Sequence, residues 1–283
     1  FRPEPDDSTV SWARRFPNRR SLLVNLNRDG VSWRAVDKGG ALGEQGSLGG
    51  EIKDVVGDMA EEWLGLTDDG WCAVSVNHRF VMSLETNLTR KNGVEEQIRI
   101  NPKAALGSKA ERGKRYAVKH NPESNSSALL AVDEEYIKQI ESTFNGVGLK
   151  VGRICCGLYG MFSDAVDQMI EARADYLKGK HQEPLGKIIV IACCEGSVCI
   201  MSSDEERWVE LRSRSGLYSA DELEPALNII MPLVENSGAR TQVVFASDQD
   251  GAALKNMIAT SSTDTLISDI SRGDGLWSLL KEE

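Results

Sequence analysis

Two stretches of the sequence share one pattern, and this repeat limits the possible folds more than any other feature. Residues 187–209 (KIIVIACCEGSVCIMSSDEERWV) contain an apolar strand, a turn at Glu195, a second apolar strand and, after an acidic turn, a third strand. Residues 21–35 (SLLVNLNRDGVSWRA) contain an apolar strand, a turn with Gly30 and a second strand with Trp33. Strands with successive apolar residues are typically buried on both faces. A repeat of this size predicts two related lobes.

The segments after each opening follow in a similar order. The first opening is followed by a glycine-rich turn region at 39–50, an amphipathic helix at 51–66 and a strand at 71–76. The second is followed by a loop and then by alternating helices and strands. We predict helices at about 220–236, 251–259 and 275–281, and strands at 241–246 and 265–270. The expected fold class is α/β, in which each lobe has three antiparallel strands followed by alternating helices and strands.

A change in composition indicates an insertion in the first half. Residues 91–115 are rich in charge and alanine and are interrupted by glycine and proline, and residues 121–127 (NPESNSS) are typical of a polar turn. We expect a small inserted α+β subdomain at about 78–127. After it, the first lobe is predicted to resume with a strand at 128–132, a helix capped by Asp133, a strand at 150–156 and a long helix at 161–177.

These patterns divide the chain into three parts. Residues 1–20 are predicted to be a flexible basic leader with arginines at 14, 15, 19 and 20. Residues 21–185 form the first lobe with its insertion, and residues 186–283 form the second lobe. The alternative for the leader is a local basic and aromatic contact with a membrane surface or an acidic partner.

The composition excludes several classes of function. With 283 residues, 41% hydrophobic and 27% charged, the chain is typical of a globular protein. Its formal charge of −10 argues against a general binder of nucleic acid or anionic membranes. No apolar run approaches the ~20 residues that span a bilayer. A membrane segment beyond Glu283 stays open.

Cysteine and histidine do not indicate a catalytic or metal site. The six cysteines at 72, 155, 156, 193, 194 and 199 lie in or beside apolar runs, which favours buried thiols in a reducing cytoplasm. His78, His120 and His181 lack metal-site spacing and are interpreted as surface loop residues. Cys156, before the predicted helix at 161–177, is the one position suited to a Cys-His hydrolase, an interpretation that we do not favour.

In order of elements the chain resembles the duplicated fold of the actin and sugar-kinase superfamily, two RNase H-like lobes. In detail it resembles the PilM proteins of type IV pili and the cytoplasmic domains of GspL proteins of type II secretion. The resemblance rests on the two hairpins, on the insertion after VSVNHRFVMSL, and on the run ALLAVDEEYIKQIESTFNGVGLKVGRI, where the family has strand, helix, "A-G-L" and strand. It covers the chain after Ser21.

The resemblance also implies where a nucleotide would bind, and this sequence departs from that pattern. ATP-hydrolysing members have acidic residues and glycines in two strand-turn-strand loops, and a Gly-Gly loop after a late strand. The first loop here has Asn25 and Asn27, the second has Ala192 and Cys194, and Ser247-Asp248 stands at the third.

Such replacements remove the charge that a hard divalent cation requires and crowd a polyphosphate. Asp29 and Glu195 are the acidic residues that could substitute as displaced ligands. About 15 residues separate Val209 from the helix at Leu223, so the subdomain that walls the nucleotide cleft in active members is not expected here. We therefore assign no catalytic, cofactor-binding or metal-binding residue and no cofactor, with Mg-ATP as a disfavoured possibility.

The resulting hypothesis is a non-catalytic scaffold, a pseudo-ATPase at the cytoplasmic face of a bacterial inner membrane. The resemblance implies that a PilM-like protein clasps the cytoplasmic tail of a PilN-like membrane protein between the first lobe and its insertion. A GspL-like protein would instead bind the assembly ATPase and continue into a membrane span. The alternatives are an ATPase or kinase with displaced metal ligands, and an unrelated regulatory role on the same fold.

Overall fold

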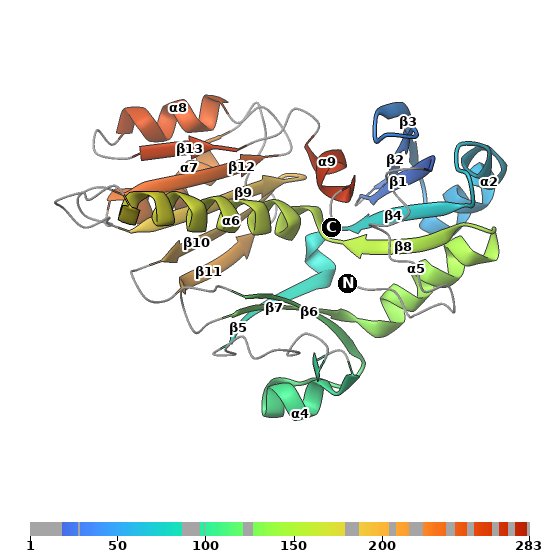
Figure 1. Ribbon diagram of the computed structural model, residues 1–283, viewed down its shortest axis with the longest axis horizontal. Helices are drawn as coiled ribbons and strands as arrows, with labels where there is room; N and C mark the ends of the chain where they lie inside the picture. Colours follow the sequence, from blue (N-terminus) through green and yellow to red (C-terminus); the bar gives the residue numbers. More distant parts are fainter. Residues whose placement is uncertain are drawn as a thin grey trace.

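Three sheets organise the protein. The computed structural model describes residues 19–27, 29–86, 97–98, 100–120, 127–178, 187–203, 208–214, 223–235, 241–247, 252–261, 266–270 and 275–281. Two five-stranded mixed sheets stand at the centres of two lobes, and a three-stranded sheet lies beside them, below both in Figure 1. None of the described helices combines the length and the hydropathy that crossing a bilayer requires.

The first sheet has the strand order β3-β2-β1-β4-β8. Strands β1, β2 and β3 are antiparallel neighbours, whereas β4 and β8 continue from β1 in parallel. The elements of this lobe are β1 Ser21–Leu26, β2 Gly30–Val36, β3 Leu42–Gly49, α2 Ile52–Gly65, β4 Trp71–Val76, α5 Glu134–Gly146 and β8 Lys150–Cys155.

The prediction of a turn region at residues 39–50 is wrong for most of its length, because β3 is a strand paired with β2. The glycines make this edge strand possible. A Cβ on Gly46 would lie 2.7 Å from Nε1 of Trp33, and a Cβ on Gly30 would lie 2.1 Å from the carbonyl oxygen of Leu48. The bare backbone of Gly46 therefore lets the Trp33 indole lie across the strand.

The second sheet repeats this arrangement with the order β11-β10-β9-β12-β13. Its first three strands are antiparallel and the next two continue in parallel from β9, as in the first sheet. The elements are β9 Ile188–Cys194, β10 Ser197–Ser203, β11 Trp208–Arg214, α7 Glu224–Glu235, β12 Gln242–Ser247, α8 Ala252–Ser261, β13 Leu266–Asp269 and α9 Leu276–Lys281. The predicted duplication is confirmed by the equivalent orders and directions of the strands.

The inserted subdomain is built on the third sheet, whose order is β5-β7-β6. Residues 128–132 are predicted above to belong to the first lobe, but β7 is the central strand between β5 and β6 and pairs antiparallel with both. The apolar residues of β7 correctly indicate a buried strand, but they do not indicate which strands it pairs with. The elements are η2 His78–Phe80, β5 Val81–Thr86, α4 Pro102–Leu106, η3 Gly107–Lys109, β6 Lys114–His120 and β7 Ser127–Asp133.

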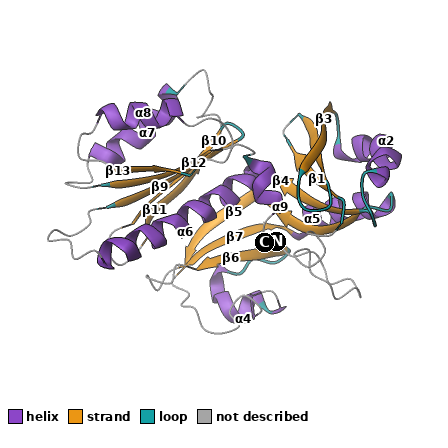
Figure 2. Ribbon diagram, turned by 45° about the horizontal axis from the view of Figure 1, so that its top comes forward, coloured by secondary structure: helices purple, strands orange, loops and turns teal. Residues whose placement is uncertain are grey.

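Helix α6, Gly157–Lys178, connects the lobes. It begins four residues before the predicted start at 161 and follows β8 of the first sheet, but it packs along β9 and β12 of the second sheet (Figure 2). The predicted boundary at residue 185 places α6 in the first lobe, although most of its contacts are with the second lobe.

One apolar core runs through both lobes. It joins residues of the first sheet, the inner face of α6, alternate residues of β9 and the side chains of α9. In the first lobe Trp63 is fully buried and stacks on Phe144 with ring centroids 6.3 Å apart. The other alternate residues of β9, Ile189 and Ile191, face a second core under α7 and α8. Strand β9 is thus buried on both faces, as predicted.

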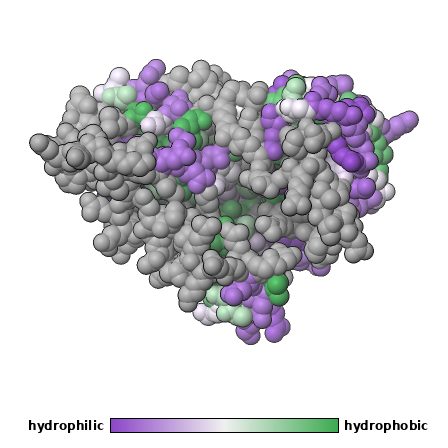
Figure 3. All heavy atoms as spheres, viewed as in Figure 1, coloured by the Kyte–Doolittle hydropathy of each residue, from purple (hydrophilic) through white to green (hydrophobic). Residues whose placement is uncertain are grey.

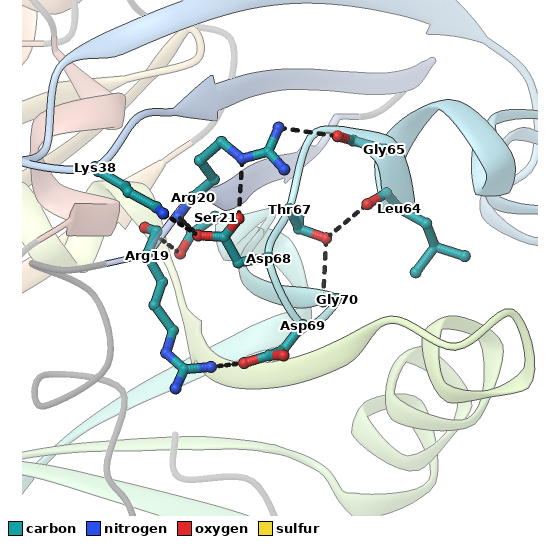
Figure 4. A network of polar contacts seen from close by, with 10 residues as sticks. All are labelled: Arg19, Arg20, Ser21, Lys38, Leu64, Gly65, Thr67, Asp68, Asp69 and Gly70. Atoms are coloured by element: carbon teal, nitrogen blue, oxygen red, sulfur yellow. Dashed lines mark hydrogen bonds and ion pairs between the residues drawn. The ribbon is translucent and has the colours of Figure 1, made fainter.

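Ion pairs fix the start of the first strand (Figure 4). The Arg20 amide and its Nε donate to the two carboxylate oxygens of Asp68, each at 3.0 Å, and Arg19 pairs with Asp69. Lys38 lies 3.7 Å from the same Asp68 carboxylate. The flexible leader predicted for residues 1–20 therefore does not include its last two arginines. Residues 1–18 lie outside the described part of the chain.

Candidate functional site

The two opening hairpins meet between the lobes. Asn25, at the end of β1, donates from Nδ2 to Oε1 of Glu195 at 2.6 Å and to Oδ1 of Asn27 at 2.5 Å. Asn27 in turn donates from Nδ2 to Oγ of Ser32 at 3.3 Å. Asn25 is only 4% exposed. The residues predicted at the first phosphate loop are therefore joined directly to the turn of the second lobe.

The backbone of the second hairpin brings Glu195 to this position. Glu195 and Gly196 form a two-residue turn with φ of 49° and 72°, and Cys194 pairs with Ser197 across it. A turn with two positive φ angles favours Asn and Gly, and an L-residue other than these is strained there. Glu195 adopts this conformation while its carboxylate accepts the hydrogen bond from Asn25.

The residues predicted at the second loop are apolar and packed. Ala192 is fully buried and Cys194 is 1% exposed. A Cβ on Gly157, the first residue of α6, would lie 3.0 Å from Sγ of Cys194 and 2.5 Å from Cδ1 of Leu276 in α9. Two lobes and the last helix thus converge at this glycine. At the predicted third loop Ser247 is buried, and Asp248 lies outside the described residues.

Asp29 and Glu195 have different surroundings. The carbonyl of Asp29 accepts a hydrogen bond from the Gly50 amide at 3.4 Å, in the turn between β1 and β2. Glu195 is held by Asn25. In the part of the chain that the structure describes, no group of three or more His, Cys, Asp or Glu side chains is placed to hold a metal ion.

The six cysteines are free thiols, and five of them are buried, with Cys155 half-buried. Burial raises the pKa of the Cys156 thiol well above its ordinary value, although the backbone amides of Tyr159 and Leu158 oppose the shift. A buried thiol with a raised pKa is protonated and is a poor nucleophile. The Cys-His hydrolase interpretation therefore has no support at Cys156.

The interpretation of His78 as a surface loop residue is wrong, because its exposed fraction is 8%. It lies in η2, and burial, with a smaller effect of the neighbouring Arg79, lowers its pKa below the ordinary value. His78 is therefore a neutral packed side chain at the junction of the insertion. The side chain of His120 and all of His181 lie outside the described residues.

An aromatic surface at that junction was not found by sequence reasoning. Phe80 stacks on Tyr136 of α5 with ring centroids 4.5 Å apart, and the Arg79 guanidinium lies 5.4 Å from the Phe80 centroid. Phe80 stays 44% exposed and Met82, in β5, stays 39% exposed. Burial raises the pKa of Tyr136 to about 12, so its hydroxyl stays protonated. We call Phe80, Met82 and Tyr136 the junction surface.

The insertion is attached to the first lobe by a partly buried arginine. Arg115 of β6 donates from Nε and Nη2 to the Glu134 carboxylate at 2.9 and 2.7 Å, and from Nη1 to Glu141 at 2.6 Å. Lys114 pairs at 2.9 Å with Asp133, so this helix-capping residue binds a lysine and makes no side-chain cap. Paired, bidentate contacts of this kind fix orientation as well as distance. The junction surface therefore lies between rigidly connected elements.

No protein family and no curated protein matches the sequence. Among solved structures, a Bacteroides thetaiotaomicron protein with an actin-like ATPase fold and unknown function is similar at 10% identity and a TM-score of 0.49, with 98% of this chain and 100% of that chain covered. The cytoplasmic domain of EpsL, an inner-membrane component of the Vibrio cholerae type II secretion system, is similar at 10% identity and a TM-score of 0.49, with 93% and 92% covered.

A structure of the PilM–PilN type IV pilus biogenesis complex is similar at 12% identity and a TM-score of 0.47, with 92% of this chain and 89% of that chain covered. Kinases are also among the matches. At such low sequence identity, these likenesses say nothing about function. The order and direction of strands in the two lobes are those expected for the actin-like fold, so the chain is a two-lobed α/β protein of actin-like architecture with an α+β insertion in its first lobe.

Proposed function

We propose that this chain is a non-catalytic scaffold of a pilus or type II secretion assembly platform on the cytoplasmic side of a bacterial inner membrane. The observation that carries the proposal is the 2.6 Å hydrogen bond from Asn25 to Glu195. In the fold that the sequence resembles, the two hairpin turns hold metal and phosphate between them. Here the two turns are hydrogen-bonded to each other through Asn25 and Glu195.

The chemistry of these turns supports the loss of a nucleotide site. Asn25 is neutral, so it adds no charge to attract Mg²⁺. The carboxylate of Glu195 lies beside it, and its Oε1 accepts a hydrogen bond from Asn25. Without a bound cation, a carboxylate at this place repels a polyphosphate. At the second turn Cys194 stands where the resembled family has a glycine that lets the phosphate approach, and its side chain is buried in the apolar core.

The junction surface supports the binding of a partner. Phe80 and Met82 are large apolar side chains at 44% and 39% exposure, next to Tyr136. Exposed aromatic and methionine side chains are enriched where proteins bind one another. This surface joins the first lobe to the insertion, which is the place where the resemblance implies that a PilN-like tail binds.

Nucleotide titration tests the enzymatic alternative. Calorimetry with Mg-ATP should show no saturable binding to the wild-type protein. Tight, metal-dependent binding that Glu195→Ala or Asp29→Ala abolishes would instead support an ATPase or kinase with displaced ligands and would refute the scaffold proposal.

Partner capture tests the scaffold directly. The purified chain should retain an inner-membrane protein from detergent-solubilised membranes, and Phe80→Ser should lose it. Met257→Ser is the matched control, because Met257 on α8 is also 44% exposed. Equal retention by the wild-type protein and both variants would show that the junction surface is not the binding site.

A further inference from the structure

The inserted subdomain ends in a basic tip. Helix α4 projects away from both lobes in Figure 1, and hydrophilic and hydrophobic side chains share this end of the molecule in Figure 3. Ile100 is 71% exposed. Lys103, Lys109 and Arg112 are exposed in the same short segment. We call these four residues the insertion tip.

The tip has the opposite charge to the rest of the chain. Residues 100–120 contain six Lys or Arg residues and one Glu, a net charge of +5, whereas the whole chain carries −10. All the other residues together therefore carry −15. Lys114 pairs with Asp133 at the end of β7, and Arg115 pairs with Glu134 and Glu141 of α5. Lys103, Lys109 and Arg112 are instead exposed, next to the single exposed carboxylate of Glu111.

The tip is held in a defined shape. Ile98, Leu106 and Leu129 form a small core with Tyr116 and Ala110 packed against it. The Tyr116 hydroxyl accepts from the Glu111 amide at 2.7 Å, which fixes the turn next to Arg112. Ile100 is thus exposed although the subdomain has an apolar core of its own that buries Ile98.

We propose that the insertion tip docks on an anionic lipid bilayer. Peptide recognition uses grooves and sheet edges, whereas this surface is a projection that suits contact with a plane. An exposed aliphatic side chain in the same segment as exposed cations matches the boundary of acyl chains and headgroups. The opposite charges of tip and body would also orient the acidic molecule with its tip toward the negative surface. This inference rests on the proposed function, for which it names the membrane-facing surface.

The expected strength follows from the charges. Each Lys or Arg near an anionic surface contributes enough that removing two should weaken binding about thirtyfold. Loss of the Ile100 side chain should weaken it roughly fivefold, since the side chain is only partly inserted. Binding should fall as salt rises, because the interaction is screened.

The test is sedimentation of the purified chain with vesicles of phosphatidylcholine, with and without phosphatidylglycerol. The wild-type protein should bind only the vesicles that contain phosphatidylglycerol. Lys103→Glu combined with Arg112→Glu should lose this binding, and Ile100→Ser should weaken it. The matched control is Lys53→Glu combined with Lys255→Glu on α2 and α8, which makes the same change in net charge away from the tip and should bind as the wild type does.

Several results would overturn the proposal. These are absence of binding by the wild-type protein, equal loss in the control variant, and unchanged binding in the tip variants. Retention on polyglutamate but not on vesicles would assign the tip to an acidic protein instead. Thermal melts check that each variant is folded. If Lys103→Glu combined with Arg112→Glu is unfolded, the neutral double variant Lys103→Gln with Arg112→Gln replaces it. Vesicle binding is independent of Mg-ATP and of partner capture, so its failure is distinguishable from failure of the scaffold.

Discussion

Replacing Asn25 with Asp changes one donor group into an acceptor at the contact between the lobes. The Nδ2 atom of Asn25 lies 2.6 Å from Oε1 of Glu195, so the variant faces two carboxylates toward each other at a residue that is 4% exposed. Two unit charges about 4 Å apart repel by about 4 kcal/mol at an effective dielectric constant of about 20. Protonating one carboxyl at pH 7 costs a similar ~4 kcal/mol.

The repulsion of two charged carboxylates and the cost of protonating one of them each set an upper limit on the loss of stability. Solvent near the partly exposed Glu195 makes the actual loss smaller. We expect the free energy of unfolding to fall by about 2–4 kcal/mol, which corresponds to a melting temperature lower by roughly 5–10 °C. Asn228→Asp is the matched control, since Asn228 is exposed on α7. It should melt within about 1 °C of the wild type.

A second substitution restores the pair with reversed polarity. In Asn25→Asp combined with Glu195→Gln, the new amide can donate to the new carboxylate, so most of the stability should return. Magnesium should also raise the melting temperature of Asn25→Asp, because two carboxylates and the Asn27 amide oxygen are ligands that a hard cation prefers. Thermal melts in EDTA and in magnesium measure both effects. A double variant no more stable than Asn25→Asp would refute the reasoning.

Three further predictions test other contacts. Gly157→Ala should lower the free energy of unfolding by about 1–3 kcal/mol, because its Cβ would lie 2.5 Å from Leu276. Gly57→Ala lies in open space on α2 and should raise the free energy of unfolding by about 0.5–1 kcal/mol. Urea unfolding measures both variants, and equal effects would contradict the packing described. Arg115→Ala should cost about 2–4 kcal/mol of unfolding free energy, because it leaves the Glu134 and Glu141 carboxylates without their shared partner, and Arg115→Lys should recover only part of this in the same assay. The pKa of His78 is lowered from its ordinary value of 6.5, so the unfolded state binds a proton first and stability should fall as the pH drops below about 6.5; melts of His78→Gln should show a shallower pH slope, and an unchanged slope would assign the effect to other groups.

Much of the architecture was predictable because it depends on local patterns. Strand β9 is a continuous apolar run and β1 is a mostly apolar one, and each lies next to turn residues. Alternate residues of β9 pack into two different cores. Strand β3 was missed because its glycines, which elsewhere indicate turns, here make room for Trp33. Strand β7 was assigned to the wrong sheet, since the identity of a strand's neighbour depends on residues far away in the sequence.

The candidate site was predictable only in part. The sequence predicts Asn25 and Ala192 as replacements of acidic residues, because the resemblance places the family's acidic positions there. The bond between Asn25 and Glu195 joins residues 170 positions apart and depends on how the lobes pack. The stacking of Phe80 on Tyr136 likewise joins the insertion to α5, and a short turn such as NHRF gives no sign of it.

Hydrogen exchange tests the central claim most directly. The claim is that the two opening hairpins are bound to each other and not to a nucleotide. Exchange of the backbone amides at 25–31 and 193–198 would be followed with and without Mg-ATP. We predict the same rates in both conditions, with faster exchange at both hairpins only in Asn25→Asp. Slower exchange at both hairpins of the wild-type protein on adding Mg-ATP would contradict the account.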